Sequence, residues 1–100
     1  MLNTLIASTV WIASWYGPYY HGRMTANGEI FNQEASTAAH KTLPFGTKLK
    51  VCYRSLCEVV RINDRGPFIT GRDLDISKGT ARRIGMMGAG VAPVQVTILK

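Results

Sequence analysis

A strand pattern that ends in an aspartate and a turn is the feature that most constrains this chain. The β-branched residues Val59, Val60 and Ile62 favour a strand, whereas Gly66-Pro67 cannot continue its pairing because proline lacks an amide hydrogen. Asp64 stands between the two, so its carboxylate is expected at a strand end beside a turn, and it is the leading catalytic candidate. Asn-Asp before Gly-Pro is also common turn chemistry, so a plain turn aspartate is the competing interpretation.

The length and composition fit one small globular domain. With 100 residues, of which 46% are hydrophobic and 18% charged, the chain can build a single modest core. Twelve Lys and Arg against six Asp and Glu give a net charge of +6, which favours an anionic partner. The basic residues are scattered and do not alternate with aromatic ones, so we expect no nucleic-acid binding.

The N-terminal residues are expected to lie outside the folded domain. We interpret residues 1–12 as an extension or processing remnant and residues 13–100 as the domain. The stretch up to Ala13 is apolar, but it is too short to span a bilayer and lacks the basic residues of a secretory signal. We therefore expect no stable membrane insertion. We also expect a monomer.

The two cysteines flank a short link between strand patterns, so we expect them to face each other across a hairpin. Opposed Cα atoms in such a pair lie about 4.5–5.5 Å apart, which suits a disulfide between Cys52 and Cys57. A disulfide indicates an exported protein, and a pair of free buried thiols is the alternative. The spacing of cysteine and histidine matches no zinc site, so we expect neither a metal nor a cofactor.

Short strand patterns separated by Gly and Pro turns predict an all-β domain. Ser77 can cap a brief helix that Gly85 ends. Because closure into a barrel removes exposed strand edges, these elements favour a small closed β barrel over an open sheet. The expected strands are residues 10–16, 49–53, 59–62, 74–76 and 94–98, with a short element at 38–40 and the helix at 78–84.

Four motifs occur in a fixed order along the chain. They are Ser14-Trp15-Tyr16-Gly17, Thr25-Ala26-Asn27-Gly28-Glu29, the run from Thr37-Ala38-Ala39-His40 to Pro44-Phe45-Gly46-Thr47, and Asn63-Asp64-Arg65-Gly66-Pro67-Phe68. Together they resemble the rare lipoprotein A family of septal lytic transglycosylases, from about Ala13 to Lys100. The resemblance implies a six-stranded double-psi β barrel with one or two short helices.

The resemblance also implies a catalytic site of three residues. Asp64 of the Asn-Asp-Arg-Gly-Pro run, Glu29 after the Asn-Gly pair and His40 of the Thr-Ala-Ala-His run fall on the family positions. Asn32 stands where many members have an aspartate, and an amide can bind a sugar but cannot hold a proton at neutral pH. The plain alternatives are a solvated turn residue for Glu29 and a satisfied core residue for His40.

The implied reaction cleaves the MurNAc-GlcNAc bond of peptidoglycan glycan strands and leaves 1,6-anhydro-muramoyl ends. The muramoyl C6 hydroxyl attacks its own anomeric carbon, so one carboxyl group can protonate the leaving oxygen and then take the hydroxyl proton. The sequence predicts Asp64 for this task, with Glu29 as a neighbouring carboxylate. Such an enzyme would be exported, to the periplasm, the outer membrane or the cell exterior.

Further residues are expected to bind the substrate. Flat side chains such as Tyr19 and Tyr20 can stack on sugar rings, and both follow the strand-ending Gly-Pro, so we expect one of them to be exposed. Trp15 is expected to be mainly structural. Asp75 matches an acidic position of expansins and family-45 endoglucanases, although it equally could cap the following helix. The predicted binding residues are Asn32, Tyr19, Tyr20, Asn63, Arg65 and Asp75.

A non-catalytic module that binds or loosens the cell wall, as expansins do, is the alternative function. The barrel is shared with expansins and family-45 endoglucanases, and a shared fold does not settle activity. The basic surface and Asn32 favour this alternative. An inhibitor or display module and cellulose hydrolysis are further alternatives.

Overall fold

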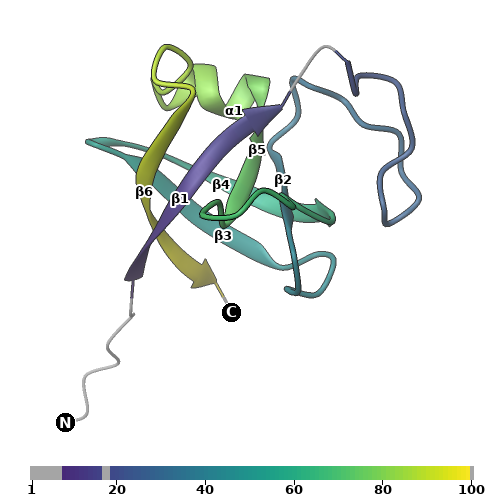
Figure 1. Ribbon diagram of the computed structural model, residues 1–100, viewed down its shortest axis with the longest axis horizontal. Helices are drawn as coiled ribbons and strands as arrows, with labels where there is room; N and C mark the ends of the chain where they lie inside the picture. Colours follow the sequence, from purple (N-terminus) through teal and green to yellow (C-terminus); the bar gives the residue numbers. More distant parts are fainter. Residues whose placement is uncertain (1–7, 17–18, 100) are drawn as a thin grey trace, which may run out of the picture.

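The computed structural model describes residues 8–16 and 19–99. Within these residues the chain forms six strands and one short helix (Figure 1). They are β1 (Ser8–Tyr16), β2 (Thr37–His40), β3 (Lys48–Tyr53), β4 (Leu56–Asp64), β5 (Leu74–Ser77), α1 (Lys78–Arg83) and β6 (Val91–Leu99).

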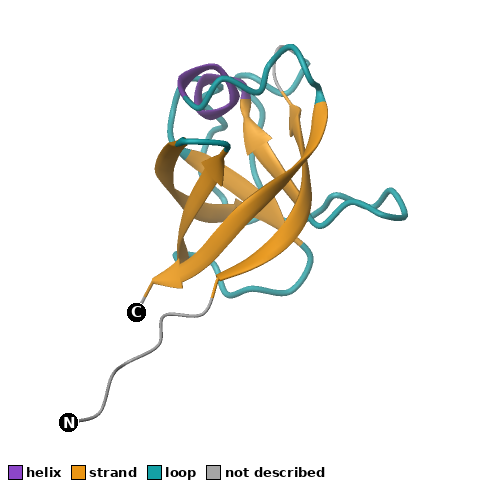
Figure 2. Ribbon diagram, turned by 90° about the vertical axis from the view of Figure 1, so that its left-hand side faces the viewer, coloured by secondary structure: helices purple, strands orange, loops and turns teal. Residues whose placement is uncertain are grey.

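The strands close into a barrel in the order β1-β5-β2-β4-β3-β6. The β1/β5 and β2/β4 pairs are parallel, and the other four pairs are antiparallel. Figure 2 shows the strands wrapping around a common interior, with α1 at the end of the barrel away from the last residues of β6. The predicted all-β closed barrel is confirmed. None of the described helical residues form a segment long and apolar enough to cross a bilayer.

Strand alternation fills the interior of the barrel. In β3, Leu49 and Val51 are buried while Lys48 and Lys50 face solvent, as expected where one face of a sheet packs on a core. β6 repeats the pattern. The core consists of Ala13, Ala38, Leu49, Val51, Val60, Ile62, Leu74, Ile76, Ala81, Ile84, Met86, Ala92, Val94 and Val96.

Strand β1 begins at Ser8, five residues before the expected start of the domain at Ala13. Residues 8–14 pair with the long strand β6, from Ser8 opposite Thr97 to Ser14 opposite Val91. The physical reason is closure, because β6 needs a hydrogen-bonded partner on the side that β3 does not cover. The remainder of the expected extension, residues 1–7, lies outside the described residues.

The β3/β4 hairpin and the helix cap agree with the sequence analysis. Arg54 begins the two-residue turn with a φ of 55°, the left-handed conformation that tight hairpin turns require. Cys52 and Cys57 lie opposite each other with Cα atoms 4.0 Å apart and form the predicted disulfide. The Ser77 hydroxyl accepts the Thr80 amide at 3.2 Å, so Ser77 caps α1, and Asp75 does not.

Residues 19–36, the described part of the segment between β1 and β2, project to one side of the barrel (Figure 1). Its inner part is a small hairpin, in which the Thr25 amide donates to the Glu29 carbonyl at 2.7 Å and Met24 bridges Ile30. Phe31 ends this hairpin and stacks on Tyr16 of β1, with ring centroids 4.7 Å apart. The described part of this segment is therefore attached to the barrel through Phe31.

Candidate active site

Four neighbouring strands bring two aspartates into one row. Ser14 of β1 is paired with Asp75 of β5, Asp75 with Ala39 of β2, and Ala39 with Asp64 of β4. The two aspartates are thus two strand spacings apart, about 9–10 Å between Cα positions. The residue between them is Ala39, whose side chain is only a methyl group, so open space separates the two carboxylates.

This row forms part of the floor of an open cavity of about 450 Å³. The cavity combines two carboxylates, two guanidinium groups and exposed aromatic edges. Such a concave mixture of apolar surface and a few polar groups is typical of a small-molecule or sugar site. The lining residues are Ser14, Tyr16, Tyr20, Ala39, Asp64, Arg65, Gly66, Pro67, Phe68, Ile69, Arg72 and Asp75.

Asp64 is the last residue of β4, as predicted from the strand pattern. Its Oδ1 accepts the backbone amides of Ala26 and Arg65, both at 2.9 Å. Gly66 then adopts a φ of 126°, which an L side chain rarely reaches, and turns the chain along the cavity wall. Because both amides hold Oδ1, Oδ2 is the oxygen of Asp64 that can meet a substrate.

Asp75 is the cavity group best suited to hold and release a proton near neutral pH. Burial raises its pKa to about 6, and the charge of Asp64 acts in the same direction. A hydrogen bond from the Ser14 hydroxyl, at 3.2 Å, and the charge of Arg72 oppose this effect without cancelling it. From the sequence, Asp75 was predicted to be a binding residue or a helix cap, and not the proton donor.

Glu29 lies outside the cavity lining, in an ion pair. Its two carboxylate oxygens accept both terminal nitrogens of Arg61 at 2.9 Å, and one of them also accepts the amide of the buried Asn63 at 2.6 Å. The hydrogen bonds from Arg61 and then Asn63 lower the pKa of Glu29 to about 2. Glu29 is therefore a permanent anion that fastens its hairpin to β4, and that hairpin supplies the Ala26 amide to Asp64.

His40 also lies outside the cavity lining. Successive strand residues point to opposite faces, so the cavity residue Ala39 leaves His40 on the other face. There its ring stacks on Trp11 with centroids 4.9 Å apart, and Nδ1 accepts the amides of Thr42 and Leu43. Burial lowers the pKa of the imidazole. His40 thus closes the turn after β2 and does not contact Asp64.

Half of the six predicted binding residues line the cavity, namely Tyr20, Arg65 and Asp75, and the other half, Tyr19, Asn32 and Asn63, do not. Tyr20 and Arg65 line the cavity, and Arg65 lies over the Phe45 ring at 4.0 Å. Tyr19 is 86% exposed but does not line it, and Asn32 accepts the amide of Glu34 within its own loop. The expected exposure past the Gly-Pro pair is confirmed, and Trp15 packs against the core.

Several cavity residues were not among the site residues predicted from the sequence. Ser14, Phe68 and Ile69 are examples. Phe68 and Ile69 are largely exposed although apolar, which gives the cavity rim a surface for the apolar faces of sugar rings. Strand alternation could have indicated Ser14, since it shares a face with Tyr16 two residues later.

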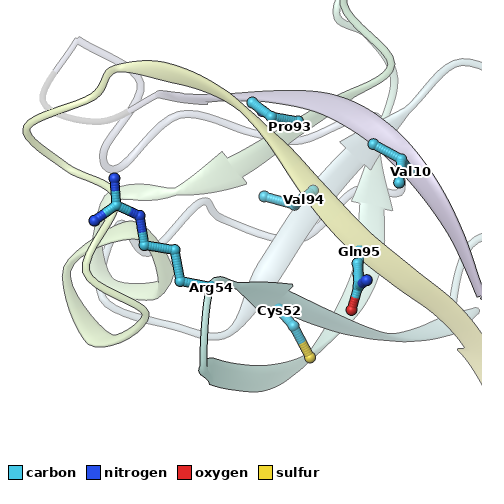
Figure 3. Close-up of a pocket in the computed structure, with 6 residues that line it drawn as sticks. All are labelled: Val10, Cys52, Arg54, Pro93, Val94 and Gln95. Carbon is cyan, nitrogen blue, oxygen red and sulfur yellow. The ribbon is translucent and has the colours of Figure 1, made fainter.

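A second, smaller cavity of about 220 Å³ lies beside the disulfide hairpin (Figure 3). Its lining residues are Val10, Cys52, Arg54, Pro93, Val94 and Gln95. None of these is a carboxylate, and Arg54 is the single charged group among them. This cavity has no group suited to acid-base chemistry, so the candidate site is the cavity that contains Asp64 and Asp75.

Comparison with known proteins assigns the family. The family model described as lytic transglycolase matches residues 8–96, from the first described residue of β1 nearly to the end of β6. The chain belongs to this family. The match confirms the rare lipoprotein A-like double-psi β barrel that the ordered motifs implied.

Individual relatives agree with this assignment. The chain is 59% identical over 91 residues to a probable endolytic peptidoglycan transglycosylase RlpA of Synechocystis sp., covering 89% of the chain and 28% of that protein. It is 53% identical over 90 residues to the endolytic peptidoglycan transglycosylase RlpA of Campylobacter jejuni, covering 88% of the chain and 33% of that protein. The chain thus spans about a third of the length of these relatives.

Solved structures agree on the fold. A Streptomyces papain inhibitor superimposes with a TM-score of 0.75, covering 94% of this chain and 96% of that protein, at 16% sequence identity. At such low identity the likeness concerns the barrel alone.

Proposed function

We propose that this domain cleaves peptidoglycan glycan strands by lytic transglycosylation, forming 1,6-anhydro-muramoyl ends. The observation that carries the proposal is that one cavity contains both Asp64 and Asp75, and that burial raises the pKa of Asp75 to about 6. The peptidoglycan transglycosylase relatives support the same reaction and substrate. They also support an exported protein on the cell-wall side, with the periplasm, the outer membrane or the cell exterior as the finer location.

In the proposed reaction Asp75 transfers the proton. Its protonated carboxyl group donates to the glycosidic oxygen as the bond to the muramoyl anomeric carbon breaks. The C6 hydroxyl oxygen then bonds to that carbon, and the Asp75 carboxylate takes the hydroxyl proton. Because the proton returns to Asp75, no water is consumed and no second proton donor is needed.

Asp64 is the second carboxylate of the proposed site. Its Oδ1 is held by two backbone amides, so the group presents Oδ2 to the cavity from a fixed position. A fixed negative charge there stabilises the positive charge that develops on the sugar ring when the glycosidic bond breaks. We therefore assign proton transfer to Asp75 and charge stabilisation to Asp64, whereas the sequence analysis gave proton transfer to Asp64.

The end group of the product tests the proposal. Purified peptidoglycan and glycan strands without stem peptides are incubated with wild type, Asp64→Asn and Asp75→Asn, and soluble products are identified by mass spectrometry. We expect anhydro-muramoyl ends from the wild type and at least a 100-fold loss in both variants, within the usual range for acid-base and electrostatic groups.

Two other results would contradict the proposal. Reducing ends would mean hydrolysis, with a water in the gap between the two carboxylates. Absence of soluble products, together with sedimentation of the protein with the wall, would favour the expansin-like binding module. Asn32→Asp is an informative companion, because it restores the carboxylate that many family members carry, and unchanged turnover would show that the amide suffices.

A further inference from the structure

Tyr16 presents a buried hydroxyl group without a hydrogen-bond partner among the described residues. Tyr16 is the last residue of β1, is 9% exposed and lines the cavity that contains Asp64 and Asp75. Leaving a buried hydroxyl unpaired destabilises a protein by about 1–3 kcal/mol, so native structures rarely do so without a reason. The location in the candidate site indicates a functional reason.

The aromatic neighbours hold the Tyr16 ring in place. Phe31 stacks on it at 4.7 Å with an interplanar angle of 22°, and Tyr20 packs edge-on at 5.7 Å. These contacts use the faces and an edge of the ring and leave the hydroxyl without a partner. The ring therefore packs as a phenylalanine would, and the hydroxyl has a separate role.

Strand alternation places Tyr16 on the same face of β1 as Ser14, which contacts Asp75. Ser14 and Tyr16 are two residues apart on β1 and lie on one face of the barrel, and Ser14 already donates to Asp75 at 3.2 Å. Burial and the charges of Asp64, Asp75 and Glu29 all raise the pKa of the Tyr16 phenol, so it remains a neutral donor throughout the working pH range.

We propose that the Tyr16 hydroxyl is a positioning group that donates a hydrogen bond to the Asp75 carboxylate once Asp75 has given up its proton. A newly formed anion at this partly buried position has one hydrogen-bond donor among the described residues, Ser14, and a second donor would stabilise it. The Tyr16 hydroxyl is available for this task, because it has no hydrogen-bond partner among the described residues. This inference rests on the proposed proton transfer by Asp75.

The charged groups around Asp75 come from three directions. Asp64 ends β4, Arg65 follows it, and Arg72 precedes β5. Strand β2 contributes only Ala39 to this face, and β1 contributes Ser14 and Tyr16, none of which is charged. A change at Tyr16 therefore alters a hydrogen-bond donor and leaves the charges near Asp75 unchanged.

Carboxyl ¹³C titration of wild type and Tyr16→Phe tests the inference directly and requires no turnover. Loss of a donor to the anion should raise the Asp75 midpoint by about one pH unit. Ser14→Ala serves as a positive control, since it removes the hydrogen bond already present. Tyr53→Phe on β3 is the matched control, because it makes the same chemical change at a tyrosine outside the cavity lining.

Turnover supplies a second readout. Tyr16→Phe should lower kcat about tenfold with little change in KM. The pH at which activity falls on the alkaline side should rise together with the Asp75 titration midpoint. If Tyr16 is purely structural, the Asp75 titration midpoint and the pH at which activity falls on the alkaline side will be the same in Tyr16→Phe as in the wild type. That result would overturn the inference.

The carboxyl titration and the turnover measurement together distinguish a failure of this inference from a failure of the proposed function. A raised Asp75 midpoint in a protein whose wild type makes no anhydro ends would establish the hydrogen bond and refute the lytic role. If Tyr16→Phe fails to fold, 3-fluorotyrosine at position 16 keeps the ring and strengthens the donor, so it should lower the midpoint. An unchanged midpoint with this residue would also overturn the inference.

Discussion

At the scale of single residues, the two cavity aspartates differ in their surroundings. Asp64 is held by two backbone amides at a strand end, whereas Asp75 is partly buried and has one hydroxyl donor among the described residues. Burial of Asp75 raises its pKa, which suits this carboxyl group to proton transfer, whereas the two amides fix the position of the Asp64 carboxylate. The sheet produces this difference, because it places one carboxylate at the end of a strand and the other within one.

Replacing Asp75 by Asn should stabilise the protein at high pH. The pKa of Asp75 is raised from 3.8 in the unfolded chain to about 6 in the folded protein. Above pH 3.8 the unfolded chain loses this proton more readily than the folded protein does, so the free energy of unfolding falls as the pH rises. The wild type thus loses stability between about pH 4 and pH 6, by at most about 3 kcal/mol, while Asp75→Asn does not. Urea denaturation at pH 3 and pH 8 measures both free energies of unfolding. The same difference at both pH values would contradict the assignment.

Local sequence patterns predicted the position of Asp64 at a strand end but not the raised pKa of Asp75. The position of Asp64 follows from neighbours within a few residues, namely a β-branched run and a Gly-Pro turn. The raised pKa of Asp75 depends on burial and on Ser14, which is 61 residues away in the chain. Likewise, the sequence shows no sign that Glu29 pairs with Arg61, because that pair forms only when the projecting hairpin docks on β4.

At the scale of elements, the projecting hairpin is part of the machinery that holds Asp64. Glu29 fastens this hairpin through Arg61 and Asn63, and the same hairpin donates the Ala26 amide to Asp64. The Asn27 amide hydrogen also donates to the Asn63 carbonyl at 3.2 Å. Glu29 thus acts on the site through the backbone and does not reach the cavity.

Replacing Glu29 by Gln should reduce turnover more than stability. The ion pair with Arg61 is partly exposed, so its loss should lower the free energy of unfolding by less than about 1 kcal/mol. A displaced Ala26 amide would misplace Asp64 and lower kcat by about tenfold or more. The matched control is Glu34→Gln, which removes an exposed pair with Arg82 outside the cavity lining. Equal kcat values for the two variants would refute this role for Glu29.

Features that depend on residues close in the sequence were predicted, whereas the pairing of distant strands was not. The disulfide hairpin and the Ser77 cap depend on residues close in the sequence, and both are found as expected. The early start of β1 depends on β6, which lies more than seventy residues later. The row from Ser14 to Asp64 needs three strand pairings that join distant segments, which strand periodicity alone cannot specify.

At the scale of the whole molecule, the charges are arranged unevenly. Half of the six acidic residues are matched by arginines, and two others, Asp64 and Asp75, line the cavity. Much of the positive charge is therefore free on the outer surface, for example at Lys48 and Lys50 of β3. The matched pairs are Glu29–Arg61, Glu34–Arg82 and Glu58–Arg83.

The net charge of +6 should draw the domain to an anionic polymer over a longer range than the cavity contacts. Peptidoglycan carries carboxylates, and the screening length shrinks from about 10 Å at 0.1 M salt to about 3 Å at 1 M. We expect co-sedimentation of Asp75→Asn with purified wall to weaken about tenfold between 0.05 and 1 M salt. Wall whose carboxyl groups are blocked by amidation is the control and should show no such dependence. If retention on untreated wall is equally strong at both salt concentrations, contacts within the cavity and not the overall charge govern binding.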